Sequence, residues 1–97
     1  MRELKDLRNE INEIDAEMRE LFTKRMKTAK EIAEYKAENS LPVFDEARER
    51  EVIEKNASLI SDEALYELYI EFLKNNMALS RKYQNTIIEN SRKGRDE

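Results

Sequence analysis

Apolar residues recur at alternating intervals of three and four residues through the first third of the chain. The positions in this repeat are Leu4, Leu7, Ile11, Ile14, Met18 and Leu21, followed after a gap by Ile32 and Tyr35. This spacing places the side chains on one stripe of a helix, which is the pattern of a buried helical face. Neither Gly nor Pro occurs between residues 3 and 38. The pattern therefore predicts one long helix over residues 3–38.

Two further helices are expected downstream. Pro42 has no amide hydrogen and disfavours helix at Leu41, so it ends the first helix. Asp45 is the expected N-cap of a second helix, which turns Val52 and Ile53 inward and ends between residues 56 and 59. This second helix is short.

A third helix is predicted from its expected N-cap, Ser61, to about residue 91. Its apolar face comprises Leu65, Leu68, Tyr69, Phe72, Leu73, Tyr83, Ile87 and Ile88. Residues 92–97 are polar and are expected to form a frayed tail. The sequence thus predicts an all-α fold with a single domain over residues 1–91. It contains three helices, one long, one short and one medium-long.

The first helix is too long for a compact monomer. About 36 residues at 1.5 Å each extend roughly 54 Å, whereas a compact chain of this length has a radius of gyration of about 12–13 Å. Such a helix overhangs the rest of the chain, and its apolar stripe needs cover. The simplest cover is a second copy, so we expect an intertwined homodimeric helical bundle.

Composition excludes several classes of function. The chain has no cysteine and no histidine, so disulfides and serine–histidine or cysteine–histidine nucleophile systems are impossible. Histidine is also the commonest metal ligand, and neither a metal nor a cofactor is expected. A net charge of −4 disfavours a broad nucleic-acid surface. Because we find no apolar run long enough for a bilayer and no signal peptide, we expect a soluble, cytoplasmic protein that binds no membrane.

Cations interrupt the apolar stripe of the first helix. Arg25 and Thr28 occupy the positions at which the repeat calls for apolar residues, and Lys36 lies eleven residues beyond Arg25. That separation is about 16 Å along the same helical face. A cation on an inward face is costly unless an anion meets it. The two cations therefore indicate a pocket for an anionic molecule. The alternatives are buried salt bridges or side chains that extend out of the interface to reach water.

A polar row also borders the apolar face of the third helix. Asn76, Ser80 and Gln84 are spaced at i, i+4 and i+8, so they share one side of that helix. Ser80 and Gln84 are expected to face partly inward. The alternative is that the row forms hydrogen bonds within itself or fills a hydrated interface.

The start of the second helix gathers three charged residues, Asp45, Arg48 and Glu49. They can contribute to the same site, or they can form only a capped N-terminus with local charge pairs. Arg8 lies seventeen residues before Arg25 on the same helix, roughly 25 Å away. Within one chain the two cannot touch one small molecule, but in a crossed or antiparallel dimer Arg8 of one chain can approach Arg25 of the other. Taken alone, Arg8 is a solvated arginine.

Several short segments occur in one order along the chain. They are residues 7–11 (LRNEI) with residues 14–15 (ID), Arg25, Lys36, residues 42–49 (PVFDEARE) and residues 80–84 (SRKYQ). Together, with these gaps, they resemble the all-helical, AroQ-type chorismate mutases over roughly residues 4–88. Three helices and a dimer, argued above from the residues, agree with this resemblance.

The resemblance implies an enzyme that converts chorismate to prephenate by a Claisen rearrangement in phenylalanine and tyrosine biosynthesis. An ether carbon–oxygen bond breaks while a carbon–carbon bond forms, and the reaction needs no proton transfer, nucleophile, metal or cofactor. Chorismate carries two carboxylates, which explains inward-facing cations in an acidic protein. Catalysis then consists of holding the reactive conformer and placing donors at the ether oxygen.

The resemblance also assigns residue roles. Arg25, together with Arg8 donated by the second chain, would bind the two carboxylates. Lys36 and Gln84 would donate hydrogen bonds to the ether oxygen, where negative charge develops.

The remaining roles concern the ring end of the substrate and its other carboxylate contacts. Glu49 would accept a hydrogen bond from the ring hydroxyl, and Arg48 and Asp45 would contact the ring end or orient other ligands. Ser80 would donate to a carboxylate. Sliding the third helix by one turn would substitute Asn76 and Ser80 for Ser80 and Gln84. We prefer the latter pair because apolar residues surround it.

Three alternatives remain. The first is an isochorismate–pyruvate lyase, which resembles these mutases and uses a similar cationic pocket; Glu49 together with Gln84 favours the mutase. The second is a non-catalytic helical dimerisation or regulatory module. The third is that the chain is one domain of a longer polypeptide of the aromatic pathway.

Overall fold

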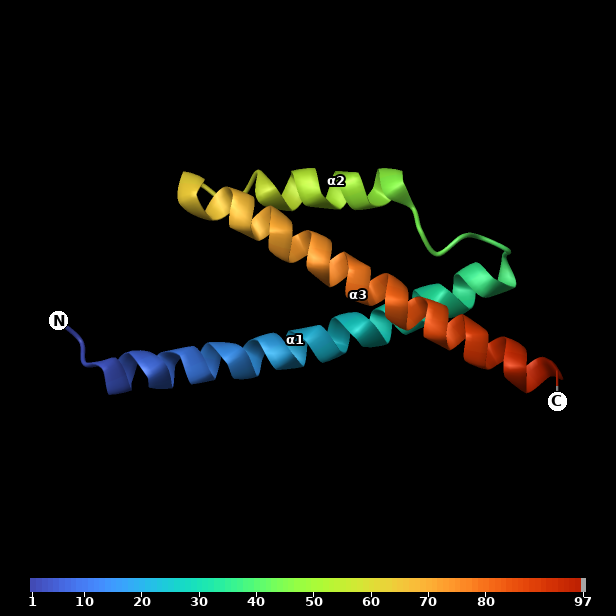
Figure 1. The fold of residues 1–97 in the computed structure, drawn as a ribbon, viewed down its shortest axis with the longest axis horizontal. Helices are drawn as coiled ribbons and strands as arrows, with labels where there is room; N and C mark the ends of the chain where they lie inside the picture. Colours follow the sequence, from blue (N-terminus) through green and yellow to red (C-terminus); the bar gives the residue numbers. More distant parts are fainter. Residues whose placement is uncertain (97) are drawn as a thin grey trace.

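The computed structural model describes residues 1–96, and these residues form three helices and no strand. Helix α1 spans Leu4–Glu38, α2 spans Glu46–Ala57 and α3 spans Glu63–Asp96 (Figure 1). The all-α fold with three helices, predicted from the sequence, is confirmed for this part of the chain. Within it, no helix combines the length and the apolarity that a membrane span requires.

Helix α1 ends where the sequence predicted, through a defined backbone motif. Ser40 adopts a left-handed conformation with φ of 55°. The N–H of Leu41 donates to the carbonyl of Lys36 at 2.8 Å, and that of Ser40 donates to the carbonyl of Ala37 at 3.4 Å. These are the bonds of a Schellman cap, which satisfies the last helical carbonyls and reverses the chain direction.

The two following helices begin at side-chain caps. Asp45 caps α2 as predicted, since its carboxylate accepts from the N–H of Arg48 at 3.0 Å. The predicted cap of α3 is wrong by one position. Asp62 rather than Ser61 precedes the first helical residue, and its carboxylate accepts from the N–H of Ala64 at 2.9 Å. A negative carboxylate also interacts favourably with the positive end of the helix dipole, which a hydroxyl does not.

Helix α3 continues to Asp96, past its predicted end near residue 91. Residues 91–93 contain no helix breaker, and Arg92 and Lys93 suit the negative end of the helix dipole. Gly94 costs only about 1 kcal/mol relative to alanine, which does not stop a helix. Glu97 lies outside the described residues, and the division into a domain of residues 1–91 and a tail of residues 92–97 stays a prediction.

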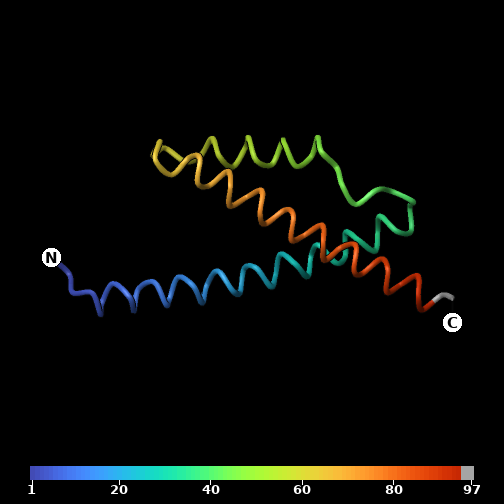
Figure 2. Tube along the Cα trace, viewed as in Figure 1, coloured from blue at the N-terminus to red at the C-terminus, as the bar shows by residue number. Residues whose placement is uncertain are grey.

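Helix α3 is the element that connects the fold. It contacts both α1 and α2, whereas α1 and α2 make no contact with each other in the described residues. Figure 1 shows α2 running back alongside the N-terminal half of α3, and α1 crossing α3 farther along. The N-terminal half of α1 projects away from the other two helices, as the trace in Figure 2 also shows.

The core of a single chain is small. Its buried apolar residues are Ala29, Ala33, Ala57, Leu73 and Met77. Ala29 and Ala33 lie one turn apart on α1 and have the smallest side chains that pack, which allows α1 and α3 to approach closely where they cross. No large side chain in the described residues is completely buried. One chain therefore provides little of the packing that a stable domain needs.

The shape of the chain agrees with this small core. The radius of gyration is 17.5 Å and the principal extents are 62 × 28 × 14 Å. A compact chain of this length has a radius of gyration of about 12–13 Å. The described chain exposes 8353 Å², whereas a compact monomer of this mass exposes about 5,800 Å².

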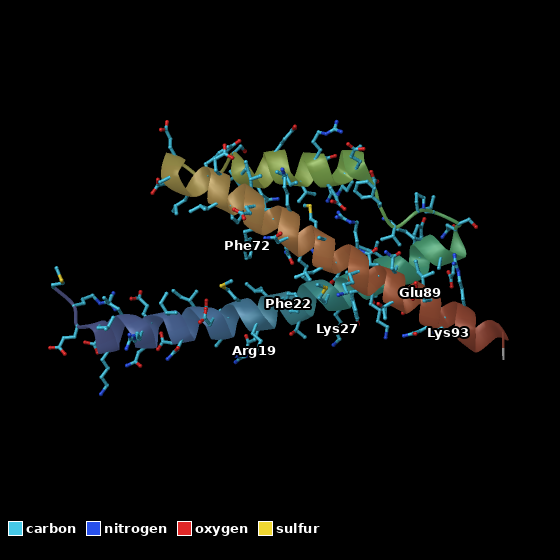
Figure 3. All side chains as sticks on the ribbon, in the orientation of Figure 1. Arg19, Phe22, Lys27, Phe72, Glu89 and Lys93 are labelled. Carbon is cyan, nitrogen blue, oxygen red and sulfur yellow. The ribbon has the colours of Figure 1, made fainter. Side chains whose placement is uncertain are left out.

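The apolar repeat of α1 is exposed along the projecting half of the helix. For example, Leu4 is 60% exposed and Leu21 is 64% exposed. Phe22 of α1 and Phe72 of α3 are also exposed, on the sides of their helices that face the opening between them (Figure 3). The stripe that the sequence marks as a buried face is thus left uncovered by the single chain.

Candidate active site

A cavity of about 420 Å³ lies where the C-terminal half of α1, the start of α2 and the middle of α3 come together. This volume falls within the range of small-molecule sites. Seven of the eight residues singled out from the sequence line the cavity: Arg25, Lys36, Asp45, Arg48, Glu49, Ser80 and Gln84. The eighth, Arg8, does not line it. The fold therefore brings together three separate segments that the sequence had marked independently.

Helix α1 supplies one wall of the cavity. Arg25, Thr28, Ile32 and Lys36 follow one another at intervals of three, four and four residues, so they share one face. Lys36 is half-buried, and its ammonium donates to the carbonyl of Val43 at 2.9 Å. Neither Arg25 nor Lys36 has a carboxylate partner among the side chains that the structure describes. The gap in the apolar stripe therefore faces the cavity, and its two cations carry no compensating anion.

The N-terminus of α2 supplies a second wall. Asp45 is engaged in capping, and Arg48 forms an exposed ion pair with Glu51 at 3.0 Å. Glu49 is half-buried and forms an ion pair with Arg81 of α3. The capped helix start with local charge pairs, left open as an alternative by the sequence, is present. The same residues also line the cavity.

Helix α3 supplies the floor through two buried polar residues. Ser80 and Gln84 are 7% and 8% exposed, and Gln84 Nε2 donates to Ser80 Oγ at 3.1 Å. Gln84 Oε1 is buried and has no hydrogen-bond partner in the described residues. Asn76 is half-buried and does not line the cavity. The structure thus places Ser80 and Gln84 at the site, in the preferred register, and the internal hydrogen bond of the alternative interpretation also forms.

One residue of the cavity was given no role from the sequence. Arg81 pairs with Glu49, and its guanidinium carbon lies 4.9 Å from the centre of the Phe44 ring. A helical signal for it existed, because Arg81 follows Met77 by four residues and precedes Gln84 by three. Its position beside Ser80 in the segment SRKYQ was noted, but its partner on α2 is 32 residues away in sequence. Sequence spacing cannot reveal such a contact.

Positive charge predominates at the cavity although the whole chain has a net charge of −4. Four cations and two carboxylates line it, which leaves a formal charge of +2. The cations are Arg25, Lys36, Arg48 and Arg81, and the carboxylates are Asp45 and Glu49. The cavity suits a small molecule that carries more than one negative group.

Arg8 lies on the projecting half of α1 and is exposed. Seventeen helical residues, roughly 25 Å, separate it from Arg25. A single chain does not bring Arg8 to the cavity, and the cavity is not closed by one chain.

The comparisons with known proteins agree with this site. Residues 7–85 match the family described as chorismate mutase type II. The chain is 39% identical, over 90 residues, to the bifunctional chorismate mutase/prephenate dehydratase of Aquifex aeolicus (strain VF5), covering 84% of this chain and 25% of the relative. It is 40% identical, over 52 residues, to the T-protein of Haemophilus influenzae (strain ATCC 51907 / DSM 11121 / KW20 / Rd), covering 54% of this chain and 13% of that relative.

The chain thus spans about a quarter or less of the length of these curated relatives. No solved structure matches it significantly. The family match covers most of the chain, including every segment that lines the cavity. The resemblance stated from the sequence is confirmed, and the chain belongs to the chorismate mutase type II family.

Proposed function

We propose that this chain catalyses the rearrangement of chorismate to prephenate, a step toward phenylalanine and tyrosine. One observation carries the proposal. Seven residues named from the sequence, scattered between positions 25 and 84, line a single cavity with excess positive charge. Family membership supports the same reaction, as does the name of the Aquifex aeolicus relative.

The reaction is an isomerisation, so no atom enters or leaves. The ether carbon–oxygen bond breaks as the new carbon–carbon bond forms, and electrons move around one ring of atoms. The transition state places negative charge on the departing ether oxygen. A protein can accelerate such a step by holding the reactive conformer and by directing donors at that oxygen.

Arg25 is suited to hold a carboxylate of the substrate. Its guanidinium can donate two parallel hydrogen bonds to a carboxylate, and no protein carboxylate competes for it among the described side chains. Ser80 offers a buried hydroxyl from the opposite side of the cavity. The second carboxylate is assigned to Arg8 of a second chain.

Lys36 and Gln84 are proposed as the donors to the ether oxygen. The Lys36 ammonium has three donor hydrogens and uses one on Val43, so two remain for substrate. The Gln84 amide satisfies only one of its two ends. Exchanging its oxygen and nitrogen, which X-ray density alone seldom distinguishes, would still leave one end unpaired beside the cavity. An ether oxygen needs only a donor, and both residues supply one.

Glu49 is proposed to accept from the ring hydroxyl of the substrate. It is the cavity carboxylate that is not engaged in capping, and its ion pair with Arg81 involves one of its two oxygens. Arg48 and Asp45 border the same end of the cavity and are proposed to contact the ring end or to orient its other ligands.

The proposed functional unit is an intertwined homodimer. The excess accessible surface is about 2,500 Å² per chain, or about 5,000 Å² for two chains, which matches obligate dimer interfaces. The uncovered stripe on α1 supplies the apolar surface for such an interface. Crossed α1 helices would bring Arg8 of each chain to the open side of the other chain's cavity. Since the chain contains no cysteine, it suits a reducing compartment, and we infer a cytoplasmic location.

The test is the loss of chorismate absorbance on addition of purified protein, with prephenate identified by acid conversion to phenylpyruvate. Saturable conversion is expected, together with the mass of a dimer in sedimentation equilibrium. A variant carrying both Lys36→Ala and Gln84→Ala, purified identically, controls for contaminating enzyme. A folded, dimeric sample that leaves chorismate unchanged would refute the proposal, and isochorismate would then be tested for release of salicylate and pyruvate.

A further inference from the structure

We infer that Arg81 is a positioning residue for the rearrangement, and that it acts by holding the carboxylate of Glu49 in place. The inference rests on the proposed function, because it concerns the orientation of a substrate ligand. Arg81 was assigned no role from the sequence or from the resemblance. Its placement in the fold supplies one.

The ion pair between Arg81 and Glu49 joins two helices at the cavity wall. Both side chains are partly buried, 32% exposed for Arg81 and 23% for Glu49. Among the side chains that the structure describes, theirs is the only side-chain to side-chain hydrogen bond between different helices. All the others form within one helix or near the N-terminus of α1. The pair is therefore the directional contact that fixes α2 relative to α3 beside the site.

Packing alone gives Glu49 no other fixed reference to the rest of the site. Helix α2 contacts α3 but not α1, whereas Arg25 and Lys36 belong to α1. The position of Glu49 relative to those cations is therefore transmitted through α3. Arg81 precedes Gln84 by three residues, so its ion pair ties the Glu49 carboxylate to the turn of α3 that carries the proposed ether donor.

The guanidinium of Arg81 is already engaged within the protein. One nitrogen donates to Glu49, and the ring of Phe44 lies 4.9 Å from the guanidinium carbon. Stacking on an aromatic face restricts the plane of an arginine and adds a favourable cation–π interaction. Arg25 differs, since it has no carboxylate partner in the described chain. Arg25 is thus free to bind substrate, whereas Arg81 is committed to Glu49.

The connecting segment reinforces the same arrangement. Phe44, which stacks on Arg81, is flanked by Val43, which accepts from Lys36, and by Asp45, which caps α2. Three consecutive residues therefore link α1, α2 and α3 around one side of the cavity. With Arg81 in place, Glu49 presents its second oxygen to a ligand hydroxyl in one orientation.

The test is a double-mutant cycle with Arg81→Met, Glu49→Ala and the variant carrying both. We expect Arg81→Met to lower kcat/KM by about 10-fold to 100-fold, mainly through kcat, because a misplaced ligand disturbs the reactive geometry. In the Glu49→Ala background, the same substitution should change kcat/KM by no more than about 3-fold, since contacting residues are strongly non-additive. Arg81→Lys should recover part of the loss, because lysine retains the charge but not the planar stack.

A matched control is Arg50→Met. Arg50 also forms an ion pair on α2, with Glu46 at 3.2 Å, but the pair is exposed and does not line the cavity. This variant should keep the kcat and KM of the unaltered chain. If Arg81→Met fails to fold, the cycle is run with Arg81→Lys, for which a smaller but equally non-additive loss is expected.

The outcomes separate the two proposals. An unaltered chain that does not convert chorismate overturns the proposed function and this inference with it. An active chain in which the effects of Arg81→Met and Glu49→Ala multiply overturns only the inference, because Arg81 would then act independently of Glu49. The inference is also overturned if Arg81→Met leaves kcat unchanged, or if its loss of kcat is accounted for entirely by loss of folded dimer.

Discussion

The side-chain amide of Gln84 donates to Ser80 Oγ at 3.1 Å, while its own oxygen is buried without a partner in the described residues. Both residues are almost fully buried at the floor of the cavity. A buried polar atom that lacks a partner destabilises a fold by about 1–3 kcal/mol. The free end of this amide therefore does not serve stability in the single chain, which is consistent with a role toward a ligand.

Replacing Gln84 by an apolar residue of similar length tests this relationship. Gln84→Leu is expected to lower kcat by at least ~10²-fold, because an oxyanion-type donor is worth about 3–4 kcal/mol. Its melting temperature should be unchanged or higher, since an unsatisfied buried amide is removed. Calorimetry and chorismate kinetics on the same preparation measure both effects. Near-normal turnover would remove Gln84 from the mechanism.

Lys36 is expected to behave similarly in kinetics but differently in stability. Lys36→Met should reduce kcat by at least ~10²-fold and should also lose the hydrogen bond to the Val43 carbonyl, which is worth about 1.5–3 kcal/mol for a charged donor. Lys30→Met, on the opposite side of α1 and away from the cavity, is the matched control. Retention of activity in Lys36→Met, with the same loss of stability, would mean that Lys36 only anchors the connecting segment.

Arg25 should contribute to substrate binding and not to folding. Arg25→Ala is expected to raise KM by about 10-fold to 100-fold, as the loss of a charge-assisted hydrogen bond predicts. The melting temperature should stay constant or rise, because no ion pair to Arg25 exists among the described side chains. A marked fall in melting temperature would instead support the structural salt bridge that the sequence left open.

A site shared between two chains makes a complementation prediction. Arg8→Ala and Arg25→Ala homodimers should each be impaired at both sites. In a mixed dimer, one cavity has its own Arg25 and receives the intact Arg8 of the other chain, so one of the two sites should work. Activity regained on mixing is measured after subunit exchange has been verified by mass spectrometry of differently tagged chains. If verified exchange restores no activity, Arg8 does not act across the interface.

The exposed stripe of α1 makes a prediction about assembly. Ile11→Asp places a charge in the expected apolar interface and should dissociate or unfold the dimer, because burying an unpaired charge is strongly unfavourable. Asn12→Asp introduces the same charge on the neighbouring, polar position and should leave the dimer intact. Sedimentation velocity and thermal denaturation distinguish the two variants. A dimeric Ile11→Asp protein with an unchanged melting temperature would show that the stripe is not the interface.

Local sequence rules were sufficient for the helices and most of their ends. The apolar spacing and the absence of Gly and Pro determine α1, and Asp45 provides the cap of α2 through its own carboxylate. The errors lie at positions where two adjacent residues compete, as Ser61 and Asp62 do for the cap of α3. They also occur where no residue forces an end, as after residue 91 of α3. Such choices differ by about 1 kcal/mol or less, which is below the resolution of propensity rules.

The sequence by itself determined the helices, the interruption of the stripe at Arg25 and the identity of the family, because each is written in local spacing or in an ordered set of motifs. Only the tertiary structure decided which of the marked residues share a cavity and that Arg81 pairs with Glu49 across 32 positions. The physical reason is that helical periodicity fixes the face on which a side chain lies but not which helix meets that face. The meeting of α3 with both α1 and α2 depends on the packing of all three helices together.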